Sequence, residues 1–360
     1  MQHHHTSPNG YAAMGRIEDG MDGAYTTTGQ GEQPGGDKKQ PEEWPLVYVV
    51  LVNWNAGAHT LKCLSSLEHN SYPNYKTVVV DNASSDGSPD TIAAAYPNVT
   101  LLRLPYNAGF TGANNKAFKY ALGHNAQFVY LLNTDTWVAP DFLTRTVETA
   151  LVDVRIGIVG SKVLHGDRPD TLQFVGAHID VRRGYNGRPI GHNQLDREQY
   201  DDVRDVDWVT GGAIMVSRAC LEATGGFDER FFAFHEDVDL SLQARTYGFH
   251  VVMAPNSRIW HVGGGSLQGP ASATHMYYSV RNALLLGQKH RPAANFLSNF
   301  VRTGCIVGAH VVQVLLSGPT WKAVRGITDG LRDYYRGTTG PRPLRLVALQ
   351  HIASDAAEHG

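Results

Sequence analysis

Residues 46–54 read LVYVVLVNW, a continuous run of apolar and β-branched side chains. Such a run is typical of a strand that is covered on both faces. Three further runs follow along the chain: KTVVVDN at 76–82, NVTLLRL at 98–104 and QFVYLLN at 127–133. Segments with helical spacing separate the runs. This region therefore predicts an α/β fold with a Rossmann-like, mostly parallel central sheet and helices on both faces.

The other elements are predicted from spacing and composition. Helices are expected over about 88–96 and 112–122, between the apolar runs. Residues 164–206 are polar and rich in Gly, Arg and Asp, which indicates an irregular excursion or a small hairpin. EDVDLSLQARTYG, residues 236–248, predicts a helix that opens with acids. The segments HVVMAP and RIWH predict two short strands, and the chain beyond about residue 273 is expected to be mostly helical.

Length and composition divide the chain into three parts. Residues 1–44 show almost no apolar periodicity and are expected to be a disordered leader. Residues 45–292 contain the predicted α/β domain, and residues 293–360 a C-terminal helical region. The net charge over 360 residues is −3, which gives no support to a nucleic-acid binder.

No segment predicts export or a membrane span. The N-terminus lacks a charged region followed by an apolar one, so no secretory signal is expected. The longest apolar stretch, Cys305–Leu316, is shorter than a transmembrane helix requires. The three cysteines share no metal-ligand spacing, and their odd number suits a reducing compartment. The expected location is therefore the cytoplasm.

Polar side chains follow each of the four apolar runs. Asn53 ends the first run, Asp81 follows the second, Asn107 follows the third, and Asn133 and Asp135 follow the fourth. In an open parallel sheet, ligands bind beyond the carboxyl ends of the strands. We therefore expect these side chains to gather at one binding edge.

Two of these clusters suit a nucleotide. In VVVDNASSDGS, residues 78–88, Asp81 or Asp86 could accept hydrogen bonds from a nucleobase N–H or from ribose hydroxyls. The same residues would also serve as a helix cap and a turn. In NAGFTGANN, residues 107–115, the glycines permit close backbone approach, and the start of the helix can face a phosphate.

LLNTDTWV, residues 131–138, has the composition of a cation site. Asn133 and Asp135 point the same way along an extended backbone. Two oxygen ligands at the rim of a sheet suit a hard divalent cation that keeps positions open for diphosphate oxygens. The alternative is that Asp135 caps a helix that starts near Pro140.

Candidates for proton transfer and for a further metal ligand lie downstream. FFAFHEDVDLSLQA, residues 231–244, contains Glu236, Asp237 and Asp239 beside an aromatic run. Partial desolvation there would raise a carboxylate pKa toward that of a useful base. Some of these acids are expected to serve only the helix dipole. His261 lies in RIWHVGGGS, and a lone histidine of this kind is usually structural.

In this order the clusters resemble the large inverting glycosyltransferases of family 2, which have the GT-A fold. The similarity runs from about Val47 to about Arg291 and is greatest to rhamnosyltransferase-type and galactofuranosyltransferase-type members. The matching strings are VNWN, VVDNASSDGS, NAGFTGANN, LLNTD, WVTGGAIMV, GGFDERFFAFHEDVDLSLQA and IWHVGGGS. The resemblance implies inverting transfer of a sugar, rhamnose or another hexose, from a nucleoside-diphosphate-sugar donor. The acceptor would be a hydroxyl of a glycan or of a lipid-linked saccharide.

The resemblance also implies a role for each matching position. Asp135 and His261 would bind Mg²⁺ or Mn²⁺, although Asn133 replaces the first acid of the family's metal-binding motif. Asp237 would be the general base, with Glu236 beside it. The remaining contacts would come from Asn53, Asp81, Asp86, Asn107, Gly109, Asn133, Gly211 and Gly212 for the donor, and from Trp208 for the acceptor.

The C-terminal region allows two interpretations. Its helices combine apolar stretches with Arg302, Lys322, Arg325, Arg332 and Arg336. Such helices could lie peripherally on the inner face of an anionic membrane, beside a lipid-linked acceptor. A helical cap that packs on the catalytic domain would explain them equally well.

Three other classes of protein share parts of this pattern. A sugar nucleotidyltransferase would carry a Gly-rich, Arg-containing phosphate loop after the first strand, where this chain has NWNAGAH. A dehydrogenase would carry GxGxxG at that position. A non-catalytic nucleotide- or carbohydrate-binding module stays open as an alternative, although it would have no need of Asp237 beside a metal site.

Overall fold

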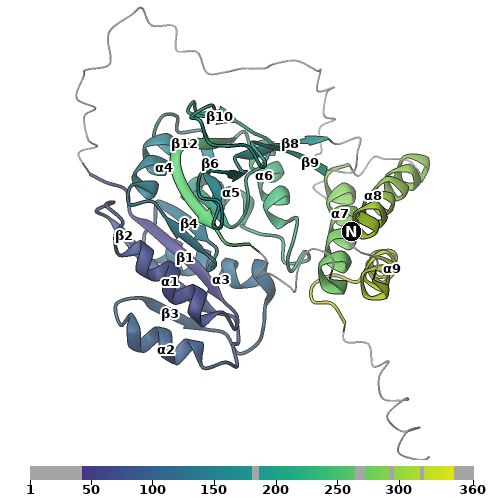
Figure 1. Cartoon of the computed structure of the whole chain (residues 1–360), viewed down its shortest axis with the longest axis horizontal. Helices are drawn as coiled ribbons and strands as arrows, with labels where there is room; N and C mark the ends of the chain where they lie inside the picture. The colour runs from purple at the N-terminus through teal and green to yellow at the C-terminus, as the bar shows by residue number, and fades with distance from the viewer. Residues whose placement is uncertain (1–42, 181–185, 264–271, 292–295, 317–319, 344–360) are drawn as a thin grey trace, which may run out of the picture.

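The computed structural model describes residues 43–180, 186–263, 272–291, 296–316 and 320–343. Residues 1–42, nearly all of the predicted leader, lie outside this part of the chain. Within it the chain forms a ten-stranded mixed sheet with helices on both faces and a helical unit at one end (Figure 1). The predicted α/β class is thus confirmed.

The first half of the sheet is parallel, as the apolar runs predict, and has the spatial order β3–β2–β1–β4. Its elements are β1 Val47–Asn53, α1 Gly57–Leu67, β2 Tyr75–Asp81, α2 Ser88–Ala95, β3 Thr100–Arg103, α3 Gly109–Gly123 and β4 Phe128–Leu132. Asn53 and Asp81 are partners in the register of β1 and β2, so these two strand ends lie side by side.

The second half of the sheet contains antiparallel strands that the apolar runs do not predict. β11 (Ala213–Ser217) is antiparallel to both β4 and β6 (Ile156–His165), whereas β12 (His250–His261) is parallel to β6. The two short strands predicted over HVVMAP and RIWH are one strand, β12, with a register shift between Ala254 and Arg258. The smaller elements are β5 Thr136–Val138, α4 Phe142–Ala150, β7 Leu172–Phe174, β8 Gly176–Asp180, β9 Asn186–Ile190, β10 Arg204–Asp205, α5 Arg218–Thr224 and α6 Glu236–Thr246. β8 and β9 form the hairpin expected within 164–206.

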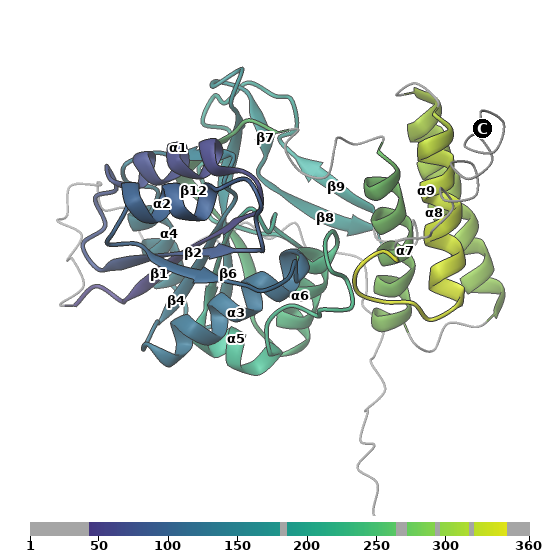
Figure 2. The ribbon, with the colours of Figure 1, turned by 90° about the horizontal axis from the view of Figure 1, so that it is seen from below.

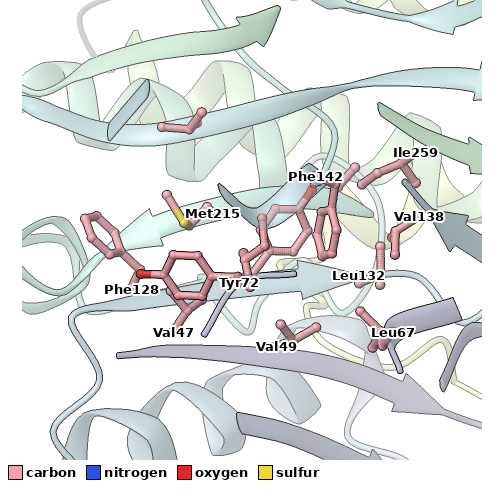
Figure 3. Packing of buried hydrophobic residues seen from close by; sticks show 14 of the residues in the cluster. Val47, Val49, Leu67, Tyr72, Phe128, Leu132, Val138, Phe142, Met215 and Ile259 are labelled. Atoms are coloured by element: carbon pink, nitrogen blue, oxygen red, sulfur yellow. The ribbon is translucent and has the colours of Figure 1, made fainter. Parts of the chain in front are cut away.

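Alternation along β1 buries both faces of the sheet. Val47 and Val49 enter the core formed with α1, α2 and α4, which Figure 3 shows packed around Phe142. Tyr48 and Val50 enter the core formed with α3, α5 and α6 on the opposite face. A one-residue shift of β1 would exchange side chains between two packed cores and pull Asn53 away from its hydrogen-bond partners, so the sheet is a fixed platform for the loops at its edge.

Three helices form a unit beside the sheet: α7 (Ala273–His290), α8 (Phe296–Leu316) and α9 (Trp321–Tyr335) (Figure 2). They share a core of their own, and α7 also packs through Leu285 and Leu286 against the region of α6. Among the described helices, one is long and apolar enough to cross a membrane on those two criteria, namely α8 over Leu297–Leu316. The expectation that the apolar stretch is too short was therefore wrong, because the helix begins well before Cys305.

Candidate functional site

Asn53, at the end of β1, organises the first group of site residues. Its amide group donates to Asp81 Oδ1 (3.0 Å) and to the hydroxyls of Ser84 (3.1 Å) and Ser88 (2.8 Å), and its oxygen accepts from the Thr60 hydroxyl (2.8 Å). Asn53 is fully buried. The polar groups of Asn53 are thus satisfied within the protein, and the side chain that it holds in place is Asp81.

Asp86 lies in the turn that leads into α2. Its carboxylate accepts hydrogen bonds from the N–H and the hydroxyl of Ser88, and the hydroxyl bond is the main reason that its pKa lies below the usual value. The alternative of a turn and cap therefore describes the contacts of Asp86. Asp81, by contrast, accepts from Asn53 and from the N–H of Ser84 (3.2 Å) at the edge of the sheet.

The turn before α3 is held by Asn82, a residue absent from the predicted site. Asn82 donates to Asn107 Oδ1 (3.0 Å) and to the Gly109 carbonyl (3.2 Å), and accepts from the Ala108 N–H (2.8 Å). Gly109 has a φ of 74°, and a Cβ there would lie 2.5 Å from the Phe232 carbonyl. Glycine is required at this position on both counts. Asn82 follows Asp81 directly, so its place at a strand end was a usable signal in the sequence.

Asp135 and His261 face each other at the same edge of the sheet. Antiparallel pairing of β5 with β12 places His261 opposite Thr136, and His261 Nε2 lies 3.2 Å from Asp135 Oδ1. The alternative role for Asp135, as the cap of a helix near Pro140, is wrong. Strand β5 follows Asp135 directly, and the N-cap of α4 is Asp141.

The atoms of this pair fit a divalent cation. Among the described residues, the buried atoms Asp135 Oδ2 and His261 Nε2 have no hydrogen-bond partner. Burial raises the pKa of Asp135, but the nearby His261 ring more than offsets this and leaves that pKa below its usual value. The carboxylate is therefore ionised at neutral pH. Gln173 is a site residue that sequence reasoning missed. Its Oε1 lies 2.9 Å from His261 Nδ1, so it orients the ring as the partners of metal-binding histidines do.

One glycine turn separates Asn133 from Asp237. The Gly212 carbonyl accepts from the Asn133 N–H (2.9 Å), and a Cβ on Gly212 would lie 2.5 Å from the Asn133 amide nitrogen. The Gly211 N–H donates to Asp237 Oδ2 at 2.9 Å. The turn therefore brings the start of α6 to the strand end that leads to Asp135.

Asp237 and Glu236 open α6 in a desolvated place. Burial raises the pKa of Asp237, although hydrogen bonds from the N–H groups of Gly211 and Val238 act in the opposite direction. Glu236 is 6% exposed, and its Oε2 has no partner among the described residues. Burial and then the charge of Asp237 raise the pKa of Glu236 well above its usual value. Of the two acids, Asp237 is thus the one whose ionised form backbone N–H groups stabilise.

Helix α7 holds the loop that precedes Asp237, residues 231–235, by hydrogen bonds. Asn282, fully buried, donates to the carbonyls of Phe231 (2.9 Å), Ala233 (2.6 Å) and Phe234 (2.8 Å). Arg281, next to it, also donates to the Phe231 carbonyl (2.9 Å). Two adjacent polar residues inside the apolar run MYYSVRNALLL were a signal that the sequence offered, because polar side chains are rarely buried without partners.

The same loop is strained. Phe232, Phe234 and His235 have φ values of 66°, 69° and 68°, a backbone conformation that residues other than glycine rarely adopt. The third acid of the helix, Asp239, is fully buried and accepts from Lys289 of α7 at 2.8 Å. Asp239 thus ties α6 to α7 and lies apart from the other two acids in its contacts.

A cavity of about 260 Å³ opens beside the Asp135–His261 pair. His261, Gln173, Gly212 and Trp208 are among the residues that line it. The rings of Trp208 and Phe174 are 4.9 Å apart, and among the described residues the indole N–H of Trp208 has no partner. The cavity therefore has an aromatic wall beside the Asp135–His261 pair, while the indole N–H of Trp208 is buried near Gly187.

Two curated relatives are named as rhamnosyltransferases. An N-acetylglucosaminyl-diphospho-decaprenol L-rhamnosyltransferase from Mycobacterium tuberculosis is 27% identical over 230 residues, covering 59% of this chain and 75% of the relative. The dTDP-rhamnosyl transferase RfbF from Shigella flexneri is 24% identical over 306 residues, covering 79% of this chain and 98% of the relative.

Solved structures and a family model agree with these relatives. GalNAc-T7 with UDP, GalNAc and Mn²⁺ has a TM-score of 0.57 at 14% identity, over 89% of this chain and 58% of that one. S. aureus TarS 1–349 in complex with UDP-GlcNAc has a TM-score of 0.53 at 14% identity, over 81% of each chain. The predicted GT-A fold is therefore confirmed. The family model described as "Glycosyltransferase like family 2" matches residues 45–278. The chain belongs to this family and is a glycosyltransferase.

Proposed function

We propose that this glycosyltransferase moves a sugar, rhamnose in the first instance, from a nucleoside-diphosphate donor to a hydroxyl of a lipid-linked saccharide or glycan, with inversion. Two relatives are named for rhamnosyl transfer, and one of these names specifies an acceptor on decaprenyl diphosphate. We expect the enzyme to work on the cytoplasmic side.

The donor nucleotide would bind beyond β1 and β2. The carboxylate of Asp81, held by Asn53, would accept a hydrogen bond from an N–H of the base. The turn at Asp86 and the turn at Asn107–Gly109 would shape the pocket. The start of α3, where Gly109 allows close approach, would face the phosphates.

Asp135 and His261 would hold the divalent cation. The unpartnered oxygen of Asp135 suits Mg²⁺ or Mn²⁺, and the imidazole nitrogen favours Mn²⁺. The described residues contain no cluster of three or more His, Cys, Asp or Glu that could hold a metal ion, so diphosphate oxygens and water would supply the other ligands. When bound, the cation would stabilise the negative charge that grows on the departing diphosphate.

Asp237 would act as the general base. Burial makes it more basic than an exposed aspartate, and the N–H groups of Gly211 and Val238 fix the direction of its carboxylate. The proton of the acceptor hydroxyl would pass to Asp237 while the hydroxyl oxygen bonds to the anomeric carbon. The bond from that carbon to the diphosphate oxygen would break at the same time. A single displacement from the opposite face inverts the configuration.

The neighbours of Asp237 would complete the site. Glu236, with its raised pKa, would stay protonated and leave Asp237 as the charged member of the pair. Gly211 and Gly212 would allow the donor sugar to approach the turn, with Asn133 beside it. Trp208 would offer the face of its ring to a sugar in the cavity.

The observation that carries this proposal is the glycine turn with Asn133 on one side and Asp237 on the other. The test incubates the full chain with dTDP-rhamnose, UDP-sugars or GDP-mannose, with and without Mn²⁺, and with a polyprenyl-diphosphate-linked N-acetylglucosamine. We expect nucleoside diphosphate to be released only when acceptor and metal are both present. The product should show the opposite anomeric configuration by NMR. Retained configuration, or release that ignores the metal with every donor, would refute the proposal.

A further inference from the structure

The outward side of α8 is apolar along its whole length. Seven large apolar residues on this helix are exposed, from 41% at Val311 to 84% at Leu316: Leu297, Phe300, Val301, Val311, Val312, Leu315 and Leu316. The helix contains one residue of the Asp, Glu, Lys and Arg set, Arg302, and that side chain is 8% exposed. A helix face that meets water normally carries polar residues, and a contiguous apolar surface of this kind marks an interaction site.

The charges next to this face are positive. Residues 296–343 contain six Lys or Arg and two Asp, an excess of four positive charges in a chain whose net charge is −3. Both acids, Asp329 and Asp333, are buried in α9, where Asp329 accepts from Arg332 and Arg342. The exposed side of α9 therefore presents bases, together with Trp321 at 88% exposure and Tyr335 at 65%. Aromatic residues that have a polar group are favoured where lipid meets water.

The inward side of α8 packs against the other two helices of the unit. Ile306 and Val314 pack in the core shared with α7 and α9. His310 of α8 and His275 of α7 both act on His235, which directly precedes Glu236. Burial first, and then the charges of these two histidines, lower the pKa of His235 to about 3. One face of α8 thus packs against α7 and α9, while the other is exposed.

We propose that the exposed apolar face of α8, from Leu297 to Leu316, lies flat on an anionic lipid bilayer, together with the exposed Lys and Arg side chains of α9. α8 and α9 lie at the outer edge of the molecule in both views, with nothing of the sheet beyond them (Figures 1 and 2). Because Ile306, Val314 and Arg302 are buried against other helices, α8 suits the interface plane better than a span. If the function proposed above is correct, this contact also brings Asp237 to lipid-linked acceptors.

Charge distinguishes a bilayer from a second copy of the chain as the occupant. A symmetric dimer through this face would bring equal sets of lysine and arginine side chains together, and like charges at an interface are unfavourable. An anionic bilayer covers the apolar residues of α8, and its negative charges pair with the Lys and Arg side chains instead of repelling them.

The natural cysteines allow a direct probe. Cys305 is exposed on α8, whereas Cys63 and Cys220 are buried, so an environment-sensitive dye will label position 305 of the full chain. The labelled protein is mixed with vesicles of phosphatidylcholine alone, or of phosphatidylcholine and phosphatidylglycerol in equal parts, and is separated by flotation. We expect a blue shift and flotation with the anionic vesicles, both weakened by high salt.

Two double variants test the two halves of the surface. F300S/L315S removes apolar area, and K322E/R336E reverses charge; we expect each to weaken vesicle binding about tenfold or more. The matched controls are V152S/V154S, which replaces two even more exposed valines in the turn after α4, and K116E/K119E, which reverses two exposed lysines on α3. Both controls should bind as the unchanged chain does. Circular dichroism and the melting temperature verify that all four variants fold.

Three outcomes would overturn the proposal. They are equal binding to both kinds of vesicle, no binding to either, or controls that lose binding as strongly as the test variants. A concentration-dependent dimer that F300S/L315S abolishes, without vesicle binding, would assign the face to a second copy. Flotation requires no donor or acceptor, so it can succeed while transfer fails. Conversely, activity on a water-soluble acceptor can survive the loss of vesicle binding, and the two proposals are therefore separable.

Discussion

Asp237 Oδ2 accepts a hydrogen bond from the backbone N–H of Gly211 at 2.9 Å, and this bond aims the carboxylate by means of main chain. A side chain on Gly211 would begin 3.2 Å from the Asp237 Cβ, so the contact tolerates little change. The next residue, Gly212, contacts Asn133. A shift of the turn would therefore displace both Asp237 and Asn133. The parts of the site are therefore mechanically joined.

Replacing the base should separate chemistry from binding. We expect D237N to lower kcat by about 10²–10⁴-fold, the usual contribution of a general base, with donor affinity changed little. Steady-state kinetics and calorimetric titration of the donor nucleotide measure the two quantities. D90N, on an exposed acid that pairs with Arg103, is the matched control and should be indistinguishable from the unchanged enzyme. Transfer at a near-normal rate by D237N would remove Asp237 from the mechanism.

The Asp135–His261 pair should govern the response to metal. H261A is expected to abolish the rise in melting temperature that Mn²⁺ and a nucleoside diphosphate together produce. Q173L keeps the ligand but frees its ring, and should weaken apparent Mn²⁺ affinity about 10–100-fold. H69A, on an exposed histidine just after α1, is the control. An unchanged metal titration in both site variants would show that the cation binds elsewhere.

Glu236 should cost stability as pH rises. Its pKa in the folded protein lies well above the unfolded value, so its stabilising contribution is complete below the unfolded pKa and is lost as pH rises through the folded pKa. E236Q cannot ionise and escapes that loss. We expect its melting temperature to match that of the unchanged chain near pH 5 and to exceed it by about 2 °C or more near pH 8. The reverse trend between pH 5 and pH 8 would mean that Glu236 is ionised in the folded state.

Asn282 should act on Asp237 through the loop that it holds. N282A leaves the carbonyls of Ala233 and Phe234 without the donor that holds them, while Arg281 still donates to Phe231, so we expect a lower melting temperature and a kcat reduced about 10–100-fold. The pKa that limits kcat at low pH should also fall toward the usual aspartate value, because a loosened loop admits water to Asp237.

The controls for Asn282 separate positioning from general damage. N282D restores the size of the side chain but not its donors, and should not rescue activity. Q288A alters an exposed residue of the same helix and should change nothing. A variant N282A that loses stability while its kcat and pH profile stay intact would limit Asn282 to a structural role.

The parallel half of the sheet could be predicted because its information is local. Each strand is one apolar run, and the polar residue that ends it lies at the binding edge by the rule for parallel sheets. Asn53, Asp81 and Asp135 were found in this way. The antiparallel strand β11 is harder to predict, since a five-residue strand preceded by two glycines carries little periodic signal.

Contacts between segments that lie far apart in the chain could not be predicted from the sequence. Nothing local to Gln173 indicates that it will meet the ring of His261, because the meeting depends on how β7 and β12 pair with β6. The grip of Asn282 on the loop before Asp237 likewise depends on the docking of α7. Polar residues within an apolar helix indicate that hydrogen-bond partners exist, but the sequence does not identify those partners.

The antiparallel pairing of β5 with β12 has a consequence for biosynthesis. Asp135 is translated early, whereas His261 belongs to the last strand that joins the sheet, so the two can meet only after nearly all of the domain has left the ribosome. Ribosome-bound chains that stop before β12 should therefore fold their parallel half and yet show no affinity for Mn²⁺. In this protein, metal capture would report that the sheet is complete.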